Sequence, residues 1–147
     1  MISKFKSAPK TKTRSRSRGS SMIETVCGSF ILVIVALFLV DVAAVVVCQT
    51  QNDALAKHCA RAAANKDTYG AAQGAMNSVI TEFQKTGGGS KICVYNSAAL
   101  DATYFANAQA YVQVTVTCNF PVPVPLGPSS LQFKADAIEP VVAQLPP

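Results

Sequence analysis

The sequence has few of the residues from which catalytic and metal sites are built. It contains one histidine, His58, and its acidic residues are scattered along the chain. None of the five cysteines forms a C-x-x-C pair, so we expect no zinc or other metal site. No carboxylate is placed to orient His58, which we interpret as a surface or packing residue. We therefore expect no cofactor, no catalytic residues and no enzyme activity.

Acidic residues are also missing from the first 18 positions, where seven bases lie: Lys4, Lys6, Lys10, Lys12, Arg14, Arg16 and Arg18. The remaining six bases and eight acids leave residues 20–147 at a net charge of −2. The overall charge of +5 thus belongs to the N-terminal segment and does not indicate nucleic-acid binding by the folded part. We predict a disordered basic leader over residues 1–19 and no nucleic-acid partner.

A long apolar run follows the basic leader. Residues 26–47 are apolar except for Gly28, Ser29 and Asp41. A helix over residues 25–48 would be about 36 Å long, which is enough to cross a bilayer core of about 30 Å. The bases on its N-terminal side predict a single-pass protein in membrane lipid, with a cytoplasmic N-terminus and an exported C-terminal domain.

The membrane span is predicted to be part of a longer helical region. Residues 20–66 contain the span and then an alanine-rich extension over residues 54–66. A polar run at residues 49–53 marks the exit from the membrane. There the helix either continues or restarts, with Asn52 or Asp53 as its N-cap.

The C-terminal part, residues 67–147, is predicted to form a small exported α+β domain. Apolar residues at helical spacing predict an amphipathic helix over residues 71–85. Alternating apolar and polar residues then predict short strands near residues 92–95, 111–118 and 131–137. The predicted fold class is α+β, with a long N-terminal transmembrane helix, short amphipathic helices and a small antiparallel sheet.

Two of the cysteines lie in the predicted exported domain. Because exported domains face an oxidising compartment, we expect a disulfide between Cys93 and Cys118, worth about 3–4 kcal/mol by loop entropy. We interpret the other three, Cys27, Cys48 and Cys59, as packing residues or thiols. Cys48 and Cys59 cannot bridge within one helix, because the helix rises about 16 Å between them.

The junction between the basic and apolar runs suggests a processing site. A protease that cuts next to a bilayer needs a flexible position with little side-chain bulk, and Gly19 provides one. A cut after Gly19 would give Ser20 a new amine and make Glu24 the fifth residue of the shortened chain. The ammonium and the carboxylate can pair within one chain or between neighbouring helices, which lowers the cost of an ion near lipid.

Together, the basic leader, Gly19, Glu24 and the apolar helix resemble the class III signal of type IV prepilins. Over residues 14–64 the chain is similar to the TadE/TadF group, the pilin-like proteins of the tight-adherence (Flp) pilus system. Members of that group have an acid late in the apolar helix and then a basic residue like Arg61. The resemblance implies that a prepilin peptidase cuts between Gly19 and Ser20 and that Glu24 acts in subunit assembly.

The resemblance also implies a function. It points to a minor pilin or pseudopilin acting in pilus assembly and surface adhesion, located in the bacterial inner membrane and in the extracellular pilus. Its expected partners are the prepilin peptidase, other pilins and the assembly-platform proteins of the Tad system. The sequence departs from type IVa pilins, because it lacks their Thr-Leu-Ile-Glu pattern and has serine where they start with an aromatic residue or methionine.

Several alternatives stay open. Asp41, about 25 Å along the helix from Glu24, either marks the end of the span or faces a neighbouring subunit in a helical bundle. Taken alone, Glu24 also fits an ordinary acid at the start of a helix, favoured by the macrodipole. The alternative function is a signal-anchored or secreted envelope domain that binds a ligand, with a signal-peptide cut after Ala44.

Overall fold

The computed structural model describes three segments, residues 18–86, 91–122 and 128–144. The chain divides into two compact units, Met1–Val35 and Ala36–Pro147, and helix α1 (Arg18–Ala64) runs through both. Most of the predicted leader, residues 1–17, lies outside the described residues.

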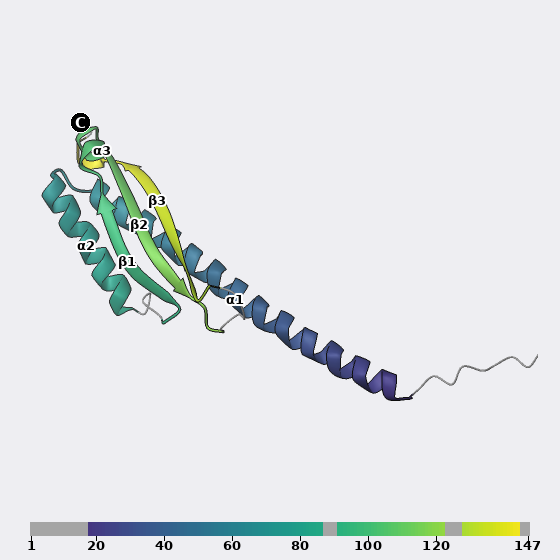
Figure 1. The fold of residues 1–147 in the computed structure, drawn as a ribbon. Coiled ribbons are helices and arrows are strands. Elements are labelled where there is room, and N and C mark those ends of the chain that lie inside the picture. Colours follow the sequence, from purple (N-terminus) through teal and green to yellow (C-terminus); the bar gives the residue numbers. More distant parts are fainter. Residues whose placement is uncertain (1–17, 87–90, 123–127, 145–147) are drawn as a thin grey trace, which may run out of the picture. The chain divides into compact units, whose positions relative to one another are not determined.

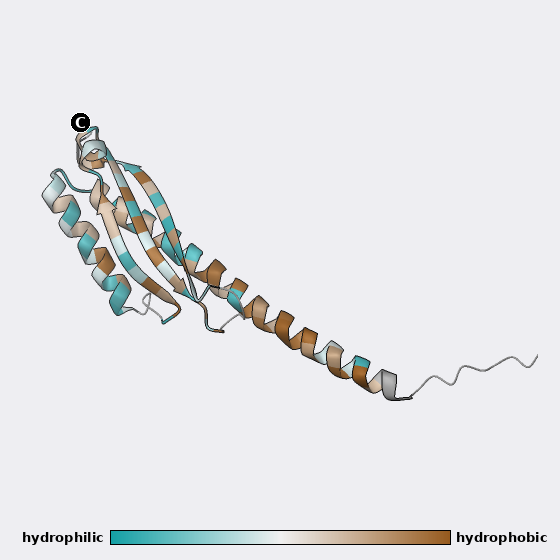
Figure 2. Ribbon diagram, viewed as in Figure 1, coloured by the Kyte–Doolittle hydropathy of each residue, from teal (hydrophilic) through white to brown (hydrophobic). Residues whose placement is uncertain are grey.

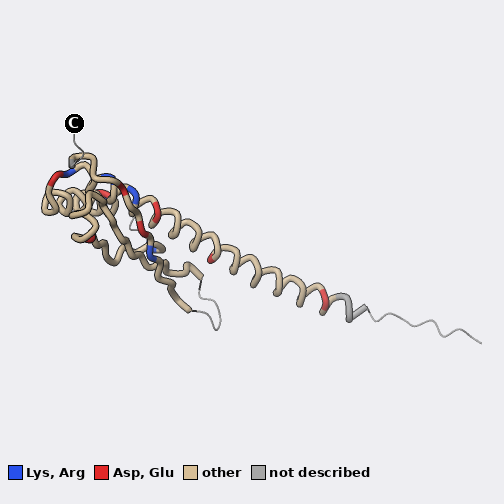
Figure 3. Tube along the Cα trace, turned by 90° about the horizontal axis from the view of Figure 1, so that it is seen from above, with Lys and Arg blue, Asp and Glu red and all other residues tan. Residues whose placement is uncertain are grey.

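The apolar part of α1 is exposed. All 19 residues over 22–40 are exposed, and most of them are large and apolar. This stretch is about 28 Å long. Figure 2 shows it as an almost continuous run of hydrophobic residues, and Figure 3 shows how few charges it carries. Many of these residues are valine and isoleucine, which form helices poorly in water but do so in lipid, where the backbone must bond to itself.

The second half of α1 buries one stripe of side chains within the unit Ala36–Pro147. Buried positions recur every three or four residues, at Asp41, Ala44, Cys48, Asn52, Leu55, Cys59 and Ala63. This spacing places them on one face of the helix. We call these seven positions the buried stripe. Most of its members are small, which allows a close approach between the helix and the sheet.

Three strands form an antiparallel sheet in the order β1-β2-β3: β1 (Cys93–Leu100), β2 (Gln109–Asn119) and β3 (Ser130–Pro140). Val112, Val114 and Val116 of β2 are fully buried. Their partners across the register are Ala137, Ala135 and Phe133 of β3. The alternation of buried and more exposed side chains along β2 explains the period of two in its sequence.

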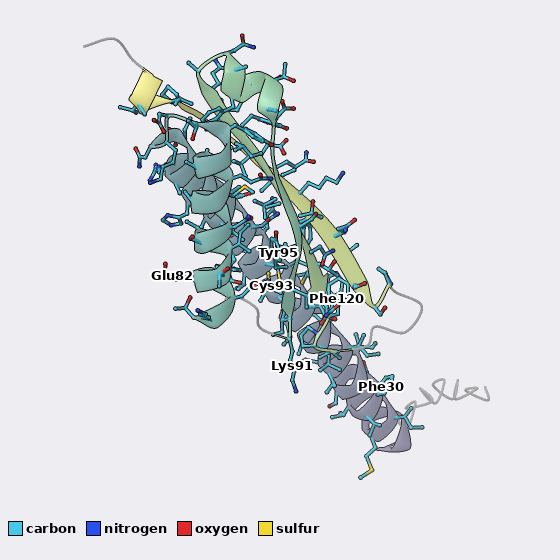
Figure 4. All side chains as sticks on the ribbon, turned by 90° about the vertical axis from the view of Figure 1, so that its left-hand side faces the viewer. Phe30, Glu82, Lys91, Cys93, Tyr95 and Phe120 are labelled. Atoms are coloured by element: carbon cyan, nitrogen blue, oxygen red, sulfur yellow. The ribbon has the colours of Figure 1, made fainter. Side chains whose placement is uncertain are left out.

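Both long helices lie on the same face of this sheet, which gives the unit two layers (Figures 1 and 4). Helix α2 (Tyr69–Lys85) buries Ala72, Met76 and Ile80 at helical spacing. At its start, the Tyr69 hydroxyl donates a hydrogen bond to the carbonyl oxygen of Leu100 at the end of β1, at 3.0 Å. Two short elements complete the fold, α3 (Ala102–Ala106) and the 3₁₀ helix η1 (Val142–Gln144).

The predicted fold class is confirmed: the chain is α+β, with a long apolar N-terminal helix, shorter helices and a three-stranded antiparallel sheet. At the polar run over residues 49–53, α1 continues rather than restarting. Asn52 therefore lies on the buried stripe and caps nothing.

Two local features differ from the sequence-based expectation. Strand β1 extends to Leu100, beyond the predicted end at residue 95. The prediction stopped early because a bulge at Asn96 shifts the register between Tyr95 and Ser97 and disrupts the alternation in the sequence. Helix α3 was not predicted, because five residues show no periodicity. Its signal is Asp101, whose Oδ1 accepts hydrogen bonds from two backbone N–H groups of the first turn.

Candidate functional site

The apolar stretch of α1 is a candidate membrane span. Within the described residues, one helical segment, Met22–Ala64, is long and apolar enough to cross a membrane. A core helix of a water-soluble protein would pass the same test, but such a helix would be mostly buried. Here only 11 % of the most apolar 18-residue stretch is buried. The burial pattern shortens the part that is exposed on all sides to residues 22–40, compared with the predicted span of residues 25–48.

The predicted processing residues lie at the beginning of α1. Gly19 and Ser20 belong to its first turn, and the surroundings of the Ser20 side chain lie outside the described residues. Glu24 is exposed one turn further along. Ser20 and Glu24 are four residues apart on one continuous helix, so one helical turn separates the two positions.

Asp41 is the first member of the buried stripe and is only 3 % exposed. Its Oδ1 accepts a hydrogen bond from the backbone N–H of Val122 at 3.3 Å. Its Oδ2 is buried without a hydrogen-bond partner among the described residues. A cavity of about 360 Å³ beside it is otherwise lined by Phe38, Val42, Val45, Phe120, Pro128 and Leu131.

This position bears on the two interpretations of Asp41 that the sequence left open. Burial within its own unit agrees with Asp41 marking the end of the exposed apolar stretch. It does not support the alternative in which the carboxylate faces a neighbouring subunit, because the side chain is covered by its own chain.

Two further polar contacts join α1 to β3. Asn52 Nδ2 donates to the carbonyl oxygen of Phe133 at 3.3 Å, and Arg61 Nε lies 3.3 Å from Glu139 Oε1. The first contact is buried and the second is largely exposed. These two contacts join α1 to β3, whereas the Asp41 bond joins α1 to Val122, in the connection between β2 and β3. The contact of Asn52 with β3 was not predicted from the sequence, although Asn52 follows Cys48 by four residues, a spacing that fits the stripe.

The structure brings together the two cysteines predicted to form a disulfide. Cys93 and Cys118 are direct partners in the register of β1 and β2, and both side chains are buried. Their sulfurs are thiols in the structure and are not joined, so the predicted bond stays a prediction. A third cysteine, Cys48 of α1, lies against the same pair, with its Sγ 3.7 Å from the carbonyl oxygen of Ile92.

Burial also changes the acidity of two thiols in the unit Ala36–Pro147. Desolvation raises the pKa of Cys59 to about 11 and raises the pKa of Cys93 above its usual value. These thiols are therefore fully protonated at neutral pH. Because the thiolate is the nucleophile, they react slowly while the unit stays folded.

His58 does not lie near the other candidate residues. It is exposed on α1 and lines a groove of about 600 Å³ between α1 and α2, together with Gln51, Leu55, Val79, Glu82 and Phe83. In the described part of the chain, no three His, Cys, Asp or Glu side chains are grouped so that they could hold a metal ion.

Comparisons with known proteins add no relative to this picture. Scans against protein-family models and searches of curated proteins and of solved structures find no match to the chain. The features of the chain that bear on its function are therefore the two halves of α1 and the residues that begin and divide them.

Proposed function

We propose that this chain is a minor pilin or pseudopilin of a type IV pilus of the tight-adherence class, processed by a prepilin peptidase and without catalytic activity. The observation that carries the proposal is the division of α1. One continuous helix has a bilayer-length half that is apolar and exposed on all sides, and a second half that forms part of the core of a small sheet domain. A subunit built in this way carries its assembly surface and part of its domain core on a single helix.

The exposed half of α1 suits both environments that a pilin helix meets. In the inner membrane, residues 22–40 contact lipid tails; in a filament they contact the same residues of other subunits. Both surroundings are apolar, so the hydrophobic effect changes little when the subunit leaves the bilayer. Association then depends on side-chain packing and on polar pairs between helices.

The processing residues fit this role. Removal of the basic leader turns the backbone nitrogen of Ser20 into an ammonium group at the positive end of the helix, one turn before Glu24. An uncompensated carboxylate in an apolar bundle is costly, and pairing with an amine of the same or a neighbouring chain offsets much of that cost.

The position of Asp41 and Ala44 argues against the alternative of a cleaved secretory signal. Both residues belong to the buried stripe, and Asp41 bonds the backbone at Val122. A cut after Ala44 would remove the first turn of the stripe and leave that backbone N–H without its acceptor.

The mature N-terminus is the decisive measurement. When the full chain is produced in a host with an active prepilin peptidase, N-terminal sequencing and intact mass should show a chain that starts at Ser20. The variant Gly19→Val should keep its leader, because a branched side chain fills the cleavage position. Gly28→Val is the matched control, since a Cβ at Gly28 meets nothing within 4 Å, and it should be processed normally. A chain that starts at Val45 or at Met1 in that host would refute the proposal.

A further inference from the structure

Three sulfur atoms from three different elements meet inside the unit Ala36–Pro147. Cys48 comes from the buried stripe of α1, Cys93 is the first residue of β1, and Cys118 lies near the end of β2. None of the three is more than 1 % exposed. The Cys48 Sγ lies 3.7 Å from the carbonyl oxygen of Ile92, the residue before Cys93, and both strand thiols help to raise the pKa of the Cys48 thiol. In Figure 4, Cys93 is labelled at the end of the sheet where this contact occurs.

The strand register places Cys93 and Cys118 in the arrangement that favours a bond between them. The Asn119 N–H donates to the Ile92 carbonyl oxygen at 2.7 Å, which makes that neighbouring pair the hydrogen-bonded one. Cys93 and Cys118 then form a non-hydrogen-bonded pair, with Cα atoms about 4.5 Å apart. Disulfides span Cα separations of about 4.4–6.8 Å, so these two can join without displacing the strands.

The third sulfur changes what the pair can do. A disulfide uses two sulfurs, and here a third lies against both of them. Depending on which two are joined, the bond either links the two strands or links the helix to the sheet. Cys59 is also buried on the stripe, but it lies 11 residues and about 16 Å further along the helix from Cys48.

We propose that Cys48, Cys93 and Cys118 form one redox site, in which Cys93 and Cys118 make the first disulfide and Cys48 is an exchange partner that can tie α1 covalently to the sheet. In the first step the two thiols lose two protons and two electrons to the disulfide of a thiol–disulfide oxidoreductase, which becomes a dithiol. In the exchange step, the Cys48 thiolate attacks one sulfur of the bond and the other leaves as a thiolate, which takes up a proton. The exchange changes no net oxidation state.

The exchange has a mechanical consequence. A Cys93–Cys118 bond leaves α1 held to the sheet by noncovalent contacts alone, whereas a bond from Cys48 makes the link covalent. Only this consequence rests on the proposed function, because a pulling force on α1 arises when a subunit is drawn from the membrane into a filament. The chemistry of the site is independent of that role.

The experiment uses the full chain with Cys27→Ser, which removes the exposed cysteine of α1. The protein is purified reduced in detergent and equilibrated with a reduced and oxidised glutathione mixture. It is then quenched in acid, alkylated after unfolding, and mapped by peptide mass spectrometry. The expected main product has Cys93 bonded to Cys118, with a minor population in which Cys48 is bonded to one of them.

Two variants and a control test the exchange. Cys118→Ala should move the bond to Cys48–Cys93, and Cys93→Ala should move it to Cys48–Cys118. Cys59→Ala is the matched control and should keep the parental bond. The proposal is overturned if Cys48 stays alkylated in every variant, or if the orphaned strand cysteine bonds to Cys59 or to a second chain.

Circular dichroism identifies any variant that fails to fold. In that case the minor Cys48 bonds of the folded parent decide the matter, and their absence overturns the proposal. Because the site is tested on purified protein, a negative result leaves the processing experiment unaffected, and the reverse also holds.

Discussion

At the scale of single residues, Asp41 is a buried acid with only part of its hydrogen-bonding capacity used. A carboxylate that is 3 % exposed makes one hydrogen bond to the Val122 N–H and has one oxygen without a partner among the described residues. Buried polar groups are costly unless they are bonded. If a nonpolar residue replaced Asp41, the backbone N–H of Val122 would lose its acceptor.

Two substitutions of Asp41 therefore distinguish the effect of its accepting oxygen from the effect of its acidic group. Asp41→Leu should lower the free energy of unfolding of the unit Ala36–Pro147 by about 1–3 kcal/mol, the cost of a donor left without an acceptor. Asp41→Asn keeps the accepting oxygen and should change it by less than about 1 kcal/mol. Denaturant titration in detergent, followed by circular dichroism, measures both. Equal losses in the two variants would show that the Val122 bond is not what the carboxylate provides.

Cys59 gives a pH dependence of defined sign. Burial raises its pKa from 9.0 to about 11, so between these values the thiol ionises in the unfolded chain but not in the folded one. The stabilisation from Cys59 is complete below pH 9 and is lost as the pH rises toward 11. Its size is about 1–2 kcal/mol once some solvent screening is allowed for.

Unfolding measured at pH 8 and at about pH 10.5, with reductant present, tests this dependence. The wild type should lose stability between the two pH values, and Cys59→Ala should lose less. Cys27→Ala, which removes an exposed thiol, should behave like the wild type. A Cys59→Ala variant with the full wild-type loss would assign the dependence to other groups, such as Tyr95, whose pKa is also raised by burial.

The residues of the sulfur cluster show how far sequence reasoning reaches. The proximity of Cys93 to Cys118 could be predicted, because both fall in the C-terminal part, which the sequence predicts to lie in an oxidising compartment. Cys48 could not be assigned to them, because its distance from β1 depends on how α1 docks on the sheet. That docking depends on the buried stripe, and its small residues cannot be distinguished in sequence from those of any other alanine-rich helix.

At the scale of elements, α1 shows why the span and the core helix were hard to separate. Lipid and a protein core both accept apolar side chains, so Val42, Val45 and Cys48 read as a continuation of the span. In the structure the stripe begins at Asp41, and residues 22–40 alone are exposed on all sides. The polar residues at 49–53 do not interrupt the helix. Of these five, Asn52 alone is buried, Gln51 is half-buried and the other three are exposed.

Two leucines on this helix provide a matched test of its division. Leu55 is 2 % exposed on the stripe, and Leu39 is 60 % exposed in the apolar stretch. Leu55→Ala should destabilise the unit Ala36–Pro147 by about 2–5 kcal/mol, since it leaves a cavity in the core. Leu39→Ala should leave that stability unchanged within about 0.5 kcal/mol. Thermal or denaturant unfolding in detergent measures both variants. Similar losses of stability in the two would contradict the division of α1 into an exposed stretch and a core-forming part.

At the scale of the whole molecule, two kinds of surface are carried by one chain. The unit Ala36–Pro147 forms a core from α1, α2 and the sheet, whereas residues 22–40 are all exposed among the residues that the structure describes. An apolar surface of that length needs lipid or other helices around it. The sequence predicts this need from composition, but not which of the two environments holds the mature protein.

Glu24 distinguishes those environments, because it is an acid within the stretch that must be covered. Under the proposed function, the charge is tolerated in lipid near the interface and becomes useful only in a filament, where the amine of Ser20 pairs with it. Glu24→Gln should therefore leave membrane insertion and leader removal intact, while the amount of the subunit in sheared surface filaments falls at least tenfold. Quantitative immunoblots of membrane and sheared fractions measure both. Glu82→Gln, at an exposed glutamate of α2, is the matched control and should assemble as the wild type does. If Glu24→Gln reached the sheared fraction at wild-type levels, Glu24 would be an ordinary acid at the beginning of a helix.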